Sequence, residues 1–191
     1  MGLLNFIFKK DKKKNDFSPD FNLSEYDNLL NFLDYGGNSD VWEIMKKENN
    51  WKFPKDSTEI FMEYQEEVRP ISDKYYRLLK IIEKDWSALY NSKDYNSALS
   101  NKVERECIDA IECFKKMRAI DIKYGEMSPK NIPAFKRLAM LYERRSDYER
   151  AADICKQAIF LEMDERPRML RMIKKAGRTP TDEEMELINS E

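Results

Sequence analysis

The chain has 191 residues, of which 41% are hydrophobic and 37% charged, and its formal net charge is −2. This length suffices for a domain with its own core, and the aromatic content of 12% excludes a fully disordered chain. The near-neutral charge gives no overall attraction to nucleic acid, so we do not expect nucleic acid as a partner.

The residue types that most catalytic and metal sites need are missing. The chain has no histidine, the commonest metal ligand and general base, and its five glycines are placed where no common nucleotide-binding loop can form. The cysteines, which lie in helical patterns without a C-x-x-C pair, favour buried free thiols in a reducing compartment. We therefore predict a cytoplasmic, non-catalytic protein without metal or cofactor; an enzyme of an unfamiliar helical type is the alternative. The cysteines are Cys107, Cys113 and Cys155.

Residues 1–21 are expected to form a flexible N-terminal arm. Five apolar residues between Leu3 and Phe8 precede a group of lysines, and the run is far shorter than the roughly 20 residues that span a bilayer. A signal peptide would carry its charges before the apolar run. Two roles remain open for residues 3–14: weak contact with a membrane surface, or docking of the arm on another subunit.

Residues 22–70 are expected to form a region of short helices. Ser24 is predicted to cap a first helix that ends at Gly36 and Gly37. Asp40 is predicted to cap a second helix that runs through Lys47 and is interrupted at Asn49 and Asn50.

A third helix is expected to start near Ser57 and to end at Pro70, because proline disrupts helix interiors. Within residues 71–178, Ser72 is expected to open a longer helix that ends in a turn at 91–94. Apolar residues at helical spacing then predict a long amphipathic helix that ends at Gly125. Since no segment alternates apolar and polar residues as a strand would, the sequence predicts an all-α fold.

The segment from Pro133 to Ile159 reads PAFKRLAMLYERRSDYERAADICKQAI. Its spacing of large and small residues resembles the tetratricopeptide repeat (TPR), a pair of antiparallel helices. Small residues at Ala139 and Ala151 would let the two helices approach closely. The sequence departs from the usual pattern at Cys155, where an aromatic residue is common, and at Met163, where a proline is common. The matching positions are Phe135, Leu138, Ala139, Tyr142, Ala151, Cys155 and Ala158.

A weaker echo of the same pattern lies near residues 72–106, where Trp86, Ser87 and Tyr90 occur. A regular solenoid needs about three repeats. The resemblance therefore implies irregular TPR-like antiparallel hairpins, completed by the other helices of the domain.

If the resemblance extends to function, one face of the first hairpin helix would bind a partner. Lys136, Met140, Glu143 and Arg144 share this face. The two cations could hold a carboxylate of the partner, and the thioether could give adaptable apolar contact. The competing interpretations are an ordinary solvated face and a hairpin that only supplies core packing.

The segment 166–178 combines an apolar stripe with a basic one. Repeat stacks need a terminal helix with a polar outer face, so we expect a C-terminal capping helix there. Basic amphipathic helices also bind membranes, helical-peptide receptors or nucleic acid. Residues 179–191 are expected to form an acidic helix or tail, which Thr181 and Glu184 open as a capping box.

Two further groups of residues favour structural roles. Trp42, Trp51 and Phe53 lie beside a lysine, as in some nucleic-acid binders, but core anchoring is the better interpretation. Four carboxylates crowd one stretch of the long helix, and we expect them to form a solvated face. They are Glu104, Glu106, Asp109 and Glu112.

Taken together, these patterns predict an adaptor or scaffold that holds a peptide or helix of an unidentified partner in a TPR-like groove. The alternative is a membrane-peripheral or nucleic-acid-associated helical protein, acting through its basic N-terminal segment or through residues 166–178.

Overall fold

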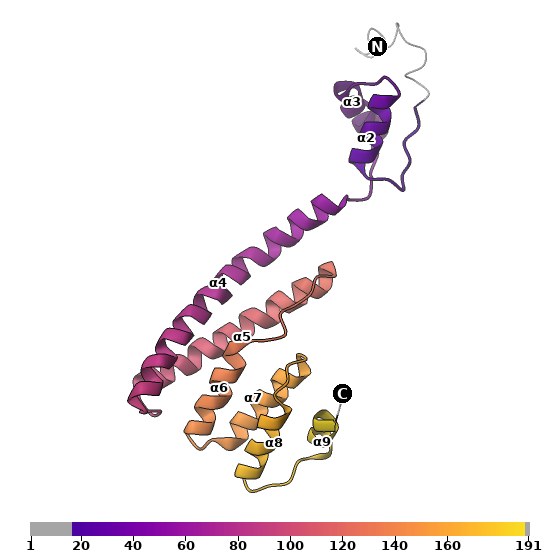
Figure 1. The fold of residues 1–191 in the computed structure, drawn as a ribbon. Helices are drawn as coiled ribbons and strands as arrows, with labels where there is room; N and C mark the ends of the chain where they lie inside the picture. The colour runs from indigo at the N-terminus through magenta and orange to yellow at the C-terminus, as the bar shows by residue number, and fades with distance from the viewer. Residues whose placement is uncertain (1–16, 190–191) are drawn as a thin grey trace. The chain divides into compact units, whose positions relative to one another are not determined.

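The structure is a computed structural model that describes residues 17–189. Within this range it contains eight helices and no strand (Figure 1), which confirms the all-α prediction. The roles predicted for residues 3–14, and most of the predicted arm, lie outside the described residues. Across residues 17–189, no helix is both long enough and apolar enough to span a bilayer. Two compact units divide between Glu63 and Tyr64, and each is described separately.

The first unit contains α2 (Glu25–Asp34) and α3 (Ser39–Asn49). The predicted cap of α2 is confirmed, since Ser24 Oγ accepts a hydrogen bond from the N–H of Asp27 at 3.1 Å. Gly37 is required after α2, because a Cβ atom there would lie 2.3 Å from the ring of Phe32.

The predicted start of α3 was wrong, whereas the interruption expected at Asn49 and Asn50 is confirmed. Asn38, and not Asp40, caps this helix: its backbone is extended, and its Oδ1 accepts from the N–H of Val41 at 2.9 Å. The helix passes Lys47 and ends at Asn49, where Asn50 takes the left-handed conformation with φ of 51°. Asparagine tolerates that conformation better than most residues.

Aromatic side chains form the core of the first unit. Phe32 and Trp42 are fully buried, with Trp51 and Phe53 packed against them. Phe17 also joins this cluster, with its ring centroid 5.1 Å from that of Phe32. The structural interpretation of the tryptophans is thus confirmed, and the C-terminal end of the predicted arm packs on the core.

Helix α4 (Ser57–Ser92) is continuous, so the prediction that Pro70 ends a helix was wrong. Because proline has no N–H, the carbonyl of Glu66 has no hydrogen-bond partner within the helix. Glu66 and Pro70 are both exposed, so this carbonyl lies on the solvent side of the helix. Val68 and Tyr75 are buried on either side of the proline, and their packing stabilises the helix through it.

In the second unit, α4 pairs with α5 (Ala98–Tyr124) in antiparallel order (Figure 1). Tyr75 lies 6.3 Å from Phe114, measured between ring centroids. Near the other end of the pair, Lys102 Nζ donates to Asp85 Oδ2 at 2.6 Å. Gly125 ends α5 with φ of 72°, as predicted.

Four shorter helices follow, and each one from α6 to α8 contacts the preceding helix. Helix α9 contacts both α7 and α8. The capping box that opens α9 is confirmed, because Glu184 and Thr181 exchange hydrogen bonds with each other's backbone N–H. The helices are α6 (Pro133–Arg144), α7 (Tyr148–Phe160), α8 (Arg166–Lys175) and α9 (Asp182–Asn189).

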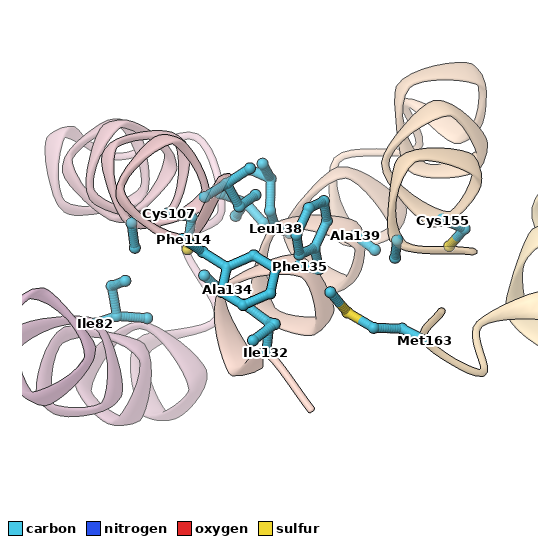
Figure 2. Packing of buried hydrophobic residues seen from close by; sticks show 14 of the residues in the cluster. Ile82, Cys107, Phe114, Ile132, Ala134, Phe135, Leu138, Ala139, Cys155 and Met163 are labelled. Atoms are coloured by element: carbon cyan, nitrogen blue, oxygen red, sulfur yellow. The ribbon is translucent and has the colours of Figure 1, made fainter. Parts of the chain in front are cut away.

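One apolar core connects the helices of the second unit. Figure 2 shows the labelled side chains of α6 between Ile82 of α4 and Phe114 of α5 on one side and Cys155 of α7 on the other, and all belong to one buried cluster. All seven positions of the repeat pattern are buried, as are the three unbridged cysteines. Desolvation raises the pKa of Cys107 to about 12 and that of Cys155 to about 12, so both are inert thiols at neutral pH.

Candidate functional site

A groove of about 570 Å³ lies between α6 and α8 of the second unit. Helix α6 contributes all four residues that the sequence suggested for binding: Lys136, Met140, Glu143 and Arg144. Helix α8 adds three cations that the sequence analysis did not assign to this site: Arg168, Arg171 and Lys175. Five of the seven lining residues are therefore cationic, and one is acidic.

The side chains of α6 that face the groove are those that the helical period places away from its buried residues. Leu138, Ala139 and Tyr142 are buried in the core, and the helical period places Lys136, Met140 and Arg144 away from them. Lys136 and Arg144 are accordingly exposed, while Met140 is half-buried.

Helix α8 lies with its apolar stripe in the core and its basic side chains toward α6. Met169, Met172 and Ile173 are almost completely buried. Arg171 and Lys175, which belong to the basic stripe of the sequence, reach Glu143 on α6. The two stripes thus have different roles in the fold: the apolar one packs in the core, while Arg171 and Lys175 of the basic one line the groove.

Glu143 is the centre of the charge cluster in this groove. Its carboxylate accepts from Lys175 Nζ at 2.8 Å and from Arg171 Nη2 at 3.2 Å, and Arg168 Nη1 lies 3.7 Å away. Desolvation acts to raise the pKa of Glu143, but the hydrogen bonds from Lys175 and Arg171 outweigh it and hold the pKa below its ordinary value. Glu143 is therefore ionised at neutral pH.

The remaining cations differ in how far their charge is compensated. Arg168 pairs with two carboxylates, since its Nε lies 2.7 Å from Glu165 Oε2 and its Nη1 lies 3.7 Å from Glu143 Oε2. Lys136 and Arg144 have no carboxylate within ion-pair distance in residues 17–189. Lys136 still helps to lower the pKa of Glu83 through its charge, and the Arg144 guanidinium lies 5.8 Å from the ring centroid of Tyr95. The groove thus offers two accessible cations without an ion pair beside a cluster in which three cations share Glu143.

A second network fixes α6 against α5 behind the groove. Glu104 accepts from the hydroxyl of Tyr142 at 2.9 Å and from the guanidinium of Arg145. Desolvation opposes ionisation of Glu104, but these two hydrogen bonds hold its pKa below the ordinary value. Desolvation and the bond to Glu104 raise the pKa of Tyr142 to about 12. The orientation of α6, and with it the groove face, depends on this network.

The prediction that the four carboxylates of α5 form a solvated face was wrong for two of them. Asp109 and Glu112 are exposed, but Glu104 and Glu106 are half-buried. Glu106 lies 3.5 Å from Lys102, and desolvation raises its pKa. The part of the chain that the structure describes contains no cluster of three potential metal-ligating side chains.

Comparison of the chain with known proteins finds no matching family model, no matching curated protein and no matching solved structure.

Proposed function

We propose that this protein is a non-catalytic adaptor or scaffold that binds an acidic segment of another protein in the groove between α6 and α8. The observation that carries the proposal is the charge of the groove, which has five cations and one carboxylate. Lys136 and Arg144 are exposed and form no ion pair within residues 17–189, so a partner carboxylate can approach both. Met140 between them offers apolar contact to the methylene groups of the segment.

The helix arrangement is compatible with a TPR-like origin for this groove. The seven pattern positions pack in the core, and the groove face of α6 is the one that the TPR resemblance implies. We accordingly propose that α6 and α7 form a TPR-like hairpin, that α4 and α5 contain its degenerate companion, and that α8 caps the stack. We also propose a cytoplasmic location, which the buried free thiols support.

The alternative role, attachment to a membrane or nucleic acid through residues 166–178, has less support. The apolar stripe of α8 is buried and would have to leave the core before it could enter a bilayer. Its basic stripe is partly compensated by Glu143. Cosedimentation with anionic vesicles measures the membrane alternative directly, and vesicle binding that is unchanged by Lys136→Glu with Arg144→Glu would favour it.

The test of the proposal is fluorescence anisotropy of the full chain with a labelled peptide that has four glutamates flanked by glycine and serine. Reversing two charges, Lys136→Glu with Arg144→Glu, is expected to weaken binding about tenfold or more, because carboxylates would then face carboxylates. The control variant reverses Lys74 and Lys116, which are exposed cations outside the groove.

The control is expected to change the affinity less than twofold at the same ionic strength, and both variants should keep the helical circular dichroism of the wild type. Equal weakening by the two variants would mean that binding reflects net charge alone. Equal binding of a peptide with four glutamines would refute recognition of carboxylates.

A further inference from the structure

Next to the groove lies a smaller hollow of about 290 Å³. Met140 lines both the groove and the hollow, so the two spaces lie on either side of one side chain. A segment long enough to pass over Met140 would reach both. The hollow is lined by Trp86, Ser87, Tyr90 and Asn91 of α4 and by Arg137 and Met140 of α6.

The hollow is electrostatically different from the groove, because its only cation, Arg137, is compensated within the protein. Arg137 donates from Nε to Glu83 Oε1 at 2.8 Å and from Nη2 to Glu83 Oε2 at 2.5 Å. Its guanidinium also lies 5.3 Å from the ring centroid of Trp86. A second carboxylate of the segment would find no uncompensated cation here.

The accessible surface of the hollow mixes polar groups with an aromatic ring and a thioether. Tyr90 is 51% exposed, and Met140 presents a half-buried thioether. Thioethers make favourable contacts with aromatic rings, and a tyrosine ring stacks on another ring or packs against an aliphatic chain. Ser87 and Asn91, both exposed, add polar groups that can bond the backbone of a bound segment.

We infer that this hollow is a second subsite, which takes one aromatic or large aliphatic side chain of the same acidic segment. The inference rests on the proposed function of the groove and extends it, because it makes the partner an acidic peptide with one apolar anchor. A nucleic acid fits less well, since the path beyond Met140 offers one exposed ring and no uncompensated cation for a further phosphate.

The test measures anisotropy of the full chain with three labelled peptides: the four-glutamate peptide, and two peptides that add one tryptophan three residues before or after the glutamates. We expect one tryptophan position to strengthen binding about tenfold, as for an aromatic anchor in a pocket. Tyr90→Ser is expected to remove this gain and to leave the affinity for the plain four-glutamate peptide within twofold.

Two further variants make the test specific to the hollow. Ser87→Phe, which fills the hollow, should also remove the gain. Tyr26→Ser removes a tyrosine that is 59% exposed in the first unit and should preserve the gain. Circular dichroism checks that each variant is folded.

The outcomes separate the two proposals. If the four-glutamate peptide binds but neither tryptophan position adds affinity, or if the gain survives both Tyr90→Ser and Ser87→Phe, the subsite inference is refuted while the groove stands. If the four-glutamate peptide does not bind the wild type, the proposed function fails, and this inference fails with it.

Discussion

Glu184, at the start of α9, gives a quantitative prediction about how the C-terminal helix is held. The residue is only 5% exposed. Arg178 donates to its two oxygens at 2.7 and 2.8 Å, and the N–H of Thr181 donates at 2.8 Å. The hydrogen bonds from Arg178, together with that from Thr181 and against the effect of desolvation, lower the pKa of Glu184 to about 2.

The size and sign of the effect follow from this pKa. A fall from the ordinary value of 4.5 to about 2 corresponds to about 3 kcal/mol of stabilisation of the folded state. Because the folded pKa is the lower one, this stabilisation is present in full above about pH 5 and is lost as the pH falls from 4.5 toward 2. Glu184→Gln should therefore lower the free energy of unfolding by about 2 to 3 kcal/mol at pH 7 and by much less at pH 3.

The assay is urea unfolding followed by circular dichroism at both pH values. Glu183→Gln is the matched control, since Glu183 also forms an ion pair, with Lys156 at 2.6 Å, but its side chain is 61% exposed. An exposed pair contributes at most about 1 kcal/mol. Trypsin cleavage after Arg178 detects local release of α9 separately from global unfolding. The reasoning is refuted if Glu184→Gln matches the control in both assays, or if its deficit is the same at pH 3 as at pH 7.

Two other substitutions test the packing that positions the groove. Arg145→Met should lower the free energy of unfolding by about 1 to 3 kcal/mol in urea titrations, because it leaves the half-buried carboxylate of Glu104 with only the exposed Arg150, 3.7 Å away, as a cation; a loss below about 0.5 kcal/mol would contradict this role. Ala139→Leu should cost about 1 to 3 kcal/mol, since Ala139 is 1% exposed and a larger side chain overpacks the core. Lys136→Leu, at an exposed position of the same helix, is its control and should change stability by less than about 0.5 kcal/mol.

The features that could be predicted from the sequence are those that depend on neighbouring residues. The Ser24 cap, the end of α5 at Gly125 and the Thr181 capping box each need only a few adjacent side chains. The presence of α6 and α7 as two helices was also predictable, because their pattern of large and small residues spans less than thirty residues. Local chemistry therefore determines most helix boundaries in this chain.

The incorrect predictions concern features that depend on tertiary contacts. Pro70 disfavours a helix locally, but burial of Val68 and Tyr75 maintains one through it. The residues around Glu104 in the sequence predict that it lies on a solvated face of α5. Its partners Tyr142 and Arg145 are 38 and 41 residues away along the chain, so no local pattern indicates its burial.

The same distinction applies to the groove. Lys136, Met140 and Arg144 could be grouped from the period of a single helix. The groove residues of α8 could not be predicted in this way, because their position depends on how α8 packs against α6. The opposing apolar and basic stripes of 166–178 indicate that the basic side faces away from the core, but they do not indicate that Glu143 attracts it.

Glu143 connects the stability of the fold to the proposed binding. A carboxylate in a groove that binds acidic segments repels the carboxylates of the ligand and by itself weakens binding. Here, however, it holds Arg171 and Lys175 of α8 on the wall of the groove, so these side chains need not be ordered when a ligand binds. Each of these cations retains donors beyond those given to Glu143, and Lys136 and Arg144 remain open beside them. The ion pairs of Glu143 that join α8 to α6 thus also preorganise Arg171 and Lys175 for binding.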